Sequence, residues 1–153
     1  MADFKIKIDE TGYYDLVIND YDLELETGFR SAVLVSLLTD GLITDPAEKN
    51  NSLETRGFWA DEFLNNDLTG SKIWGLFRTK LTPTNTALFL ERAANCLEWF
   101  KIDGIASEIN INIITAASPA DFGLDIEIIR GDKKENFIFG INWTAETANQ
   151  EIN

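Results

Sequence analysis

The sequence predicts an α+β fold with an N-terminal β-hairpin and strands, central helices and a C-terminal three-stranded antiparallel meander. Apolar and polar residues alternate in the first 26 residues and again after residue 107, which is the period of a half-buried strand. Between these regions, apolar residues recur at the three- and four-residue spacing of a helix. Strands, helices and strands therefore follow one another in blocks, an order typical of α+β proteins.

Length and composition bound the class of protein. The 153 residues predict a single domain, 1–153, with a polar tail at about 144–153 that we expect to fray. The net charge of −13 disfavours nucleic acid as a partner, because phosphates would be repelled. No stretch approaches the roughly 20 apolar residues of a membrane helix, and MADFKIKIDE lacks the apolar core of a signal peptide. We therefore expect synthesis and folding in the cytoplasm, with no membrane partner.

The chain holds one cysteine and no histidine. An internal disulfide, a structural zinc site and the Ser-His-Asp and Cys-His catalytic arrangements are therefore excluded. We expect no metal and no cofactor. Cys96 falls in a helical pattern and is expected to be a small core residue.

The first third of the chain reads as short strands. FKIKI, the turn DETG and YYDLVI form a hairpin pattern. DYDLELE alternates again and would place Asp20, Asp22, Glu24 and Glu26 on one strand face. A cation site there is conceivable, but a solvated face is favoured because alternation alone predicts it.

The middle of the chain reads as helical. Thr27 is a candidate N-cap for a helix through SAVLVSLLTD, and Gly41 would end it. Apolar residues lie on nearly every side of this helix, which predicts that it is buried. Residues 42–56 read as a loop, and a short helix is expected over SKIWGLFRTK.

The clearest helix follows this loop region. Thr82 is its expected N-cap, Pro83 its first residue and Gly104 its end. Beyond it, SEININ, FGLDIEI and NFIFGINW alternate strictly and predict a meander with one polar face.

The segment RGFWADEF, residues 56–63, allows two interpretations. Asp61 and Glu62 could form a glycosidase pair, but such carboxyls lie roughly 5–10 Å apart across a sugar, and adjacent residues on an irregular segment rarely hold that geometry. The favoured interpretation is structural: Phe58 and Trp59 bury apolar area, and Arg56 and Asp61 bond to the backbone or to each other.

Two further tryptophans, in helical segments, extend this structural set. The predicted structural anchors are Arg56, Phe58, Trp59, Asp61, Trp74 and Trp99. An anion site at Arg56, Arg78 or Arg92 is a weak prediction, since no glycine-rich phosphate loop precedes a helix.

Four stretches then carry a family resemblance: DLVINDYDLELETGFRSAVLVSLLTD, RGFWADEF, GSKIWGLFRTKLT and AANCLEWFKIDGIA. In this order and spacing, followed by an alternating strand, they resemble the Mu-like phage baseplate proteins, from about residue 15 to residue 143. That family is grouped with the wedge proteins that initiate the sheath of contractile tails.

The resemblance implies a structural protein of the virion tail baseplate and not an enzyme. Its partners would be the tail sheath protein and other baseplate wedge proteins, with about six copies expected from tail symmetry. It would reside in the host cytoplasm during assembly. An open edge of the meander would bind the sheath, and the expected assembly interface is Asn112, Asp125, Glu127 and Asn142. A small carboxylate-dependent cell-wall hydrolase is the alternative function.

Overall fold

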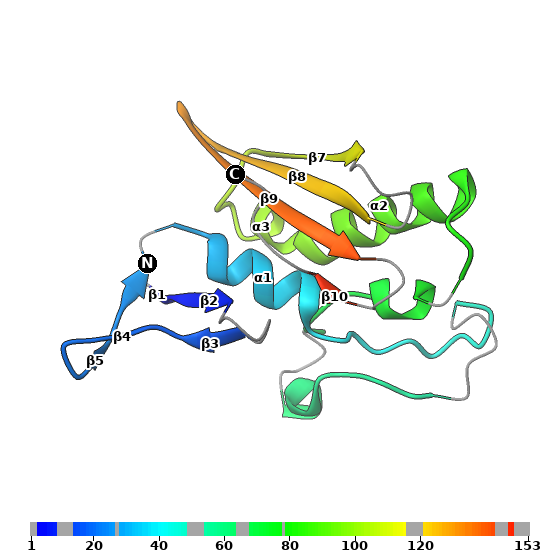
Figure 1. The fold of residues 1–153 in the computed structure, drawn as a ribbon, viewed down its shortest axis with the longest axis horizontal. Helices are drawn as coiled ribbons and strands as arrows, with labels where there is room; N and C mark the ends of the chain where they lie inside the picture. The colour runs from blue at the N-terminus through cyan, green and yellow to red at the C-terminus, as the bar shows by residue number, and fades with distance from the viewer. Residues whose placement is uncertain are drawn as a thin grey trace.

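The computed structural model describes residues 3–8, 14–26, 28–48, 54–63, 68–77, 79–115, 121–142 and 147–148. Its main body has two layers, an antiparallel sheet and a set of helices that pack on one face of it (Figure 1). A ribbon of short N-terminal strands lies beside the first helix (Figure 1). The predicted α+β class, with its order of strands, helices and strands, is confirmed.

The sheet contains the predicted meander of β7 (Glu108–Thr115), β8 (Asp121–Arg130) and β9 (Lys133–Asn142). Each strand pairs antiparallel with the next, and β8 lies between the other two. The turn between β8 and β9 is shorter than expected, because Arg130 pairs with Lys133 across only two residues. Gly131 there has φ of 57°, a conformation that glycine adopts without a steric penalty.

A fourth strand, β10 (Thr147–Ala148), pairs antiparallel with the end of β9. It falls within the tail that we expected to fray, so that expectation is wrong for these two residues. The remainder of the tail, 149–153, lies outside the described residues.

Helix α1 (Arg30–Leu38) begins later than the sequence predicted. The expected cap, Thr27, lies outside the described residues, and Phe29 occupies the N-cap position without a side-chain hydrogen bond. Glu26 acts instead: its carboxylate accepts from the Ser31 N–H at 2.9 Å and from the Ser31 hydroxyl. A negative charge at this end of a helix is favourable because the first N–H groups point outward.

Helix α2 (Pro83–Leu97) begins as predicted, with the Thr82 hydroxyl accepting from the Asn85 N–H at 3.2 Å. The predicted continuation to Gly104 is broken: the chain leaves α2 at Glu98 and resumes as α3 (Trp99–Ile102).

In the central region, 3₁₀ turns take the place of the short helix that the sequence predicted. SKIWGLFRTK forms only a 3₁₀ turn, η2 (Ile73–Leu76), and a second such turn, η1 (Trp59–Phe63), lies within RGFWADEF. Gly104 does follow the last helical turn, with φ of 69°.

The core lies between the helices and the sheet. α1, η2, α2, α3 and the strands contribute the fully or nearly fully buried side chains Val33, Leu34, Leu37, Ile73, Leu76, Phe89, Ala93, Leu97, Phe100, Leu124, Ile126, Ile128 and Phe139. The prediction that α1 is buried all round is wrong, because Val35 is 44% and Leu38 is 38% exposed. α1 therefore has a free side, away from the sheet.

The N-terminal ribbon consists of three short antiparallel strand pairs. They are β1 (Asp3–Phe4) with β6 (Leu25–Glu26), β2 (Ile6–Ile8) with β3 (Tyr14–Leu16), and β4 (Ile18–Asn19) with β5 (Asp22–Leu23). The predicted hairpin of FKIKI with YYDLVI is confirmed in the β2–β3 pair.

The three pairs meet at a junction of Lys5, Val17 and Glu24. The Lys5 N–H donates to the Glu24 carbonyl at 2.8 Å, Glu24 donates to Val17 at 2.8 Å, and Val17 donates to Lys5 at 3.0 Å. DYDLELE is therefore not one strand, since Asp20 and Tyr21 form a turn and the chain changes partner at Glu24. The predicted single acidic face does not exist, because Glu24 pairs with Lys5 and Glu26 binds Ser31.

Candidate assembly surfaces

Within GSKIWGLFRTKLT, the Gly-Ser-x-x-Trp motif at residues 70–74 closes the C-terminal end of α1. The Ser71 hydroxyl donates to the Leu37 carbonyl at 2.7 Å, which satisfies one of the carbonyls that a helix end leaves unpaired. The Ser71 N–H donates to the Thr39 carbonyl at 2.8 Å, and Gly41 donates to Ser71 at 2.7 Å. Gly70, with φ of 92°, lies so close to Thr39 that a Cβ would be 2.3 Å from the Thr39 oxygen. The motif thus has a structural explanation.

Arg56 joins the loop to this closure. Its guanidinium lies 5.2 Å from the centre of the Trp74 ring and pairs with Asp40 at 3.1 Å and Glu54 at 2.6 Å. The hydrogen bond to Glu54, followed by that to Asp40, raises the pKa of Arg56 above its ordinary value although burial opposes the shift. The expected partner Asp61 instead accepts from the Thr69 N–H at 3.0 Å.

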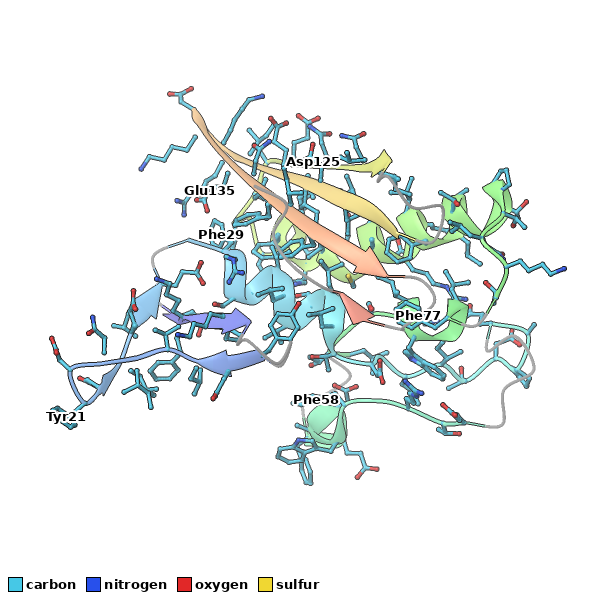
Figure 2. The ribbon with its side chains drawn as sticks, viewed as in Figure 1. Tyr21, Phe29, Phe58, Phe77, Asp125 and Glu135 are labelled. Carbon is cyan, nitrogen blue, oxygen red and sulfur yellow. The ribbon has the colours of Figure 1, made fainter. Side chains whose placement is uncertain are left out.

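Trp59 does not fill the buried position that we predicted for it. Its side chain is 77% exposed, and Phe63 on the same 3₁₀ turn is 74% exposed. Phe58 lies beside this turn (Figure 2) and is half-buried. Its ring centre is 5.7 Å from that of Trp59. The prediction failed because η1 is a single turn at the end of an irregular segment, and Arg56 and Trp74 hold that segment to the body.

Trp74 and Trp99 both contact the helical layer. Trp74 is 6% exposed and donates its indole N–H to the Gly41 carbonyl at 2.7 Å. Trp99 is half-buried, stacks on Phe100 with ring centres 3.9 Å apart and donates to the Ser36 hydroxyl at 3.1 Å.

Two of the three arginines proposed for an anion site, Arg56 and Arg92, make other contacts. Arg92 is 6% exposed and donates to the Lys72 carbonyl at 2.5 Å and the Glu48 carbonyl at 3.0 Å. Burial lowers the pKa of Arg92. Its two hydrogen bonds join the backbone at Glu48 to the backbone at Lys72. Arg56 is occupied as described, and Arg78 lies outside the described residues.

The outer face of the sheet is polar, and its side chains form a short hydrogen-bonded chain. The Asn110 amide donates to Glu127 at 3.0 Å, and Lys134 donates to the same carboxylate at 3.1 Å. These two bonds, the one from Asn110 first, lower the pKa of Glu127. Asp125 lies on the same central strand (Figure 2), and its Oδ1 has no hydrogen-bond partner among the described residues.

The four predicted interface residues do not share an edge. Asp125 and Glu127 lie on the central strand β8, and Asn142 pairs with Asp121 on one side and Thr147 on the other. Only Asn112, opposite Asp125, is on an edge strand. In the described part of the chain, β7 pairs with β8 alone, so its outer backbone groups are open.

Two adjoining hollows, of about 630 and 480 Å³, lie on the free side of the helical layer. They share Leu68, Gly70, Cys96, Trp99 and Ile102. The charged residues that line them are the acidic Asp3, Glu48, Glu91, Glu98 and Asp103 and the basic Lys72 and Arg92. Burial raises the pKa of the Cys96 thiol to about 12. No carboxylate of RGFWADEF lines either hollow.

Within the ranges given above, no group of three or more Asp, Glu, Cys or His residues is placed to hold a metal ion. None of the helices described here is long and apolar enough to cross a bilayer.

Comparison with known proteins places these features in context. Residues 29–135, from the N-cap of α1 into β9, match the family Phage protein GP46. The chain is 28% identical over 134 residues to the Mu-like prophage FluMu protein gp46 of Haemophilus influenzae, covering 87% of this chain and 92% of that protein. It is 31% identical over 101 residues to the baseplate protein gp46 of Escherichia phage Mu, covering 65% of this chain and 69% of that protein.

Proposed function

The chain belongs to the Phage protein GP46 family, and from this membership we propose that it is a structural component of a phage tail baseplate. The observation that carries the proposal is the similarity to the baseplate protein of phage Mu. The geometry is consistent with a structural part, because the motif residues Arg56, Ser71 and Trp74 hold the fold together.

We further propose that several copies, about six by the symmetry of tails, surround the tube and initiate the contractile sheath. The partners are the sheath protein and other wedge proteins of the baseplate. The net charge of −13 keeps free copies apart in the host cytoplasm until a specific partner binds them.

The β7 edge is the surface that we assign to the sheath. It is eight residues long, its Ile109, Ile111 and Ile113 side chains face the core, and Asn110 and Asn112 face outward. An extended arm of a sheath subunit can add a strand there through main-chain hydrogen bonds. This support comes from Asn112 and its strand, not from the residues of β8.

The first test is complementation of a phage or prophage that lacks the gene. Purified baseplates should contain the wild-type protein, and tails made without it should lack a sheath under the electron microscope. Complete, sheathed tails without the protein would overturn the proposal.

The edge is tested with Asn112→Pro, which removes a backbone donor and adds bulk. If the variant melts well below the wild type, the lost N–H belonged to the β7–β8 pairing, and Asn112→Lys then carries the test because lysine on an edge hinders strand addition. Asn136→Lys, the same change on the exposed face of β9, is the matched control. We expect the folded Asn112 variant to enter baseplates but to give fewer full-length sheaths than the control. Equal sheath counts would show that the arm does not bind β7.

A further inference from the structure

The hairpin of β4 and β5, residues 18–23, projects from the body and ends in an exposed aromatic residue. We call it the finger. Tyr21 lies at its end, far from the sheet and helices (Figures 1 and 2), and its side chain is fully exposed. Ile18 on the same hairpin is 71% exposed. Two large apolar side chains are therefore presented to solvent, Tyr21 at the turn of the finger and Ile18 at its base.

The backbone of the turn is unfavourable for the residue at its end. Asp20 and Tyr21 have φ of 47° and 67°, so both lie in the left-handed region that a two-residue hairpin turn requires. Aspartate tolerates this region, whereas glycine is the residue that best suits the second position and a bulky aromatic is an outlier there. Tyrosine therefore occupies a position where the backbone conformation favours glycine.

The base of the finger is fixed to the rest of the protein. Val17 and Glu24, which flank the finger, belong to the three-way junction with Lys5 described above. The Lys5 ammonium also pairs with the Glu24 carboxylate at 2.7 Å. The direction in which Tyr21 points is therefore set by the ribbon before any partner binds.

The charge around the finger indicates the kind of partner. Asp20 and Asp22 flank Tyr21 in the turn, and residues 14–26 contain no lysine or arginine. A second copy of this chain offers a poor partner surface, because five carboxylates line the hollows on its helical layer against Lys72 and Arg92. Both of these cations already have partners, Lys72 the Glu48 carboxylate and Arg92 two backbone carbonyls. A pocket with an apolar floor and a rim of lysine or arginine complements the finger.

We propose that the finger is a docking element, and that Tyr21 and Ile18 enter an apolar pocket with a basic rim on a different polypeptide of the baseplate. This inference rests on the proposed function. It assigns attachment to the baseplate to the finger, an element separate from the sheath-binding edge at β7.

The test separates folding from docking at Tyr21. Tyr21→Gly relieves the strained turn, so it should melt at or above the temperature of the wild type while its incorporation into purified baseplates falls at least tenfold. Tyr21→Phe keeps the aromatic ring and should be incorporated nearly as well as the wild type. A Tyr21→Gly protein that enters baseplates at the wild-type level would overturn the inference.

The charge is tested with Asp22→Lys, against Asp132→Lys at the tip of the other two-residue hairpin as a matched control. Only the finger variant should lose incorporation. Photocrosslinking through p-benzoylphenylalanine at position 21 should join the chain to a different baseplate polypeptide. A crosslink to a second copy of this chain would contradict the assigned partner.

The outcomes are distinguishable from those of the proposed function. If the wild-type protein is absent from purified baseplates, the proposed function fails. If the wild type is present and the finger variants are present equally, only the finger inference fails. If the Asn112 variant enters baseplates normally but gives fewer sheaths, the result supports the β7 edge and leaves the finger inference unchanged.

Discussion

The indole N–H of Trp74 donates to the carbonyl oxygen of Gly41 at 2.7 Å, across 33 residues of chain. This bond holds η2 against the segment that leaves α1, and the guanidinium of Arg56 covers the same indole ring. The position that fixes RGFWADEF to the body is therefore Trp74, while Trp59 in the segment itself faces solvent.

Truncation of the two tryptophans should have unequal effects. Trp74→Ala should lower the free energy of unfolding by about 3–5 kcal/mol, the usual cost of removing a buried aromatic side chain. Trp59→Ala should change it by less than about 0.5 kcal/mol, because the side chain is exposed. Urea unfolding of both variants checks this expectation, and equal losses would contradict the placement of Trp59.

Gly75 should not tolerate a methyl group. A Cβ there would lie 2.7 Å from Ile43 Cδ1, 2.8 Å from the Glu48 oxygen and 2.9 Å from Arg92 Nη1. Gly75→Ala should therefore cost about 1–3 kcal/mol through overpacking. Gly28→Ala is the control, because its new Cβ would meet the ends of flexible glutamate side chains. Thermal melts that agree for the two variants would refute the close packing around Arg92.

The Cys96 thiol should be unreactive in the folded protein. With its pKa raised to about 12 by burial, it stays protonated at pH 8, and the thiolate is the reactive form. Reaction with a thiol reagent such as Ellman's reagent should be slow in buffer and fast in urea, with Cys96→Ser as the blank. A native rate as fast as the unfolded rate would show that Cys96 is not buried.

Glu127 should titrate below the ordinary range of a glutamate. Its folded-state pKa is lowered, so its contribution to stability is present above the unfolded pKa and is lost as the pH falls through the folded value. Carboxyl chemical shifts followed by NMR against pH should give a midpoint below 4.5. Asn110→Ala should move that midpoint upward, and an unchanged midpoint would deny the role of the Asn110 amide.

Purified protein should release no peptidoglycan fragments above a buffer blank. The motivation is the bond between Asp61 and the Thr69 N–H, which gives this carboxylate a structural use, and the exposure of Glu62. Release that disappears in Asp61→Asn or Glu62→Gln would support the hydrolase and oppose the structural proposal.

The sequence correctly predicted the strands and helix ends that are determined by neighbouring residues. The alternating isoleucines of β7 and β8 face the core as expected, and Thr82 with Pro83 starts α2. The carboxylate of Glu26 took the place of the expected cap Thr27 because tertiary contacts with β2 fix the start of α1: the Ile6 N–H donates to the Ser31 hydroxyl. Such a contact has no signature in the helix sequence itself.

The candidate sites were harder to predict because exposure depends on distant segments. The aromatic residues of RGFWADEF predict that one of them is buried but not which one. The contacts of Ser71 and Trp74 with the end of α1 and the segment that follows it determine which side chain is buried. The Asn-Asp-Tyr-Asp stretch at 19–22 was the available signal for the finger, since polar turn residues there separate two apolar alternating runs. It was overlooked because DYDLELE alternates like a continuous strand.

The ring of hydrogen bonds among Lys5, Val17 and Glu24 also determines how the ribbon would carry a mechanical load. A simple hairpin pulled at its open end loses its bonds one after another. The three bonds of the ring instead join three separate connections of the ribbon, at Lys5 between β1 and β2, at Val17 between β3 and β4 and at Glu24 between β5 and β6. A pull on Tyr21 is therefore transmitted through Val17 and Glu24 to Lys5, so all three strand pairs of the ribbon support the finger.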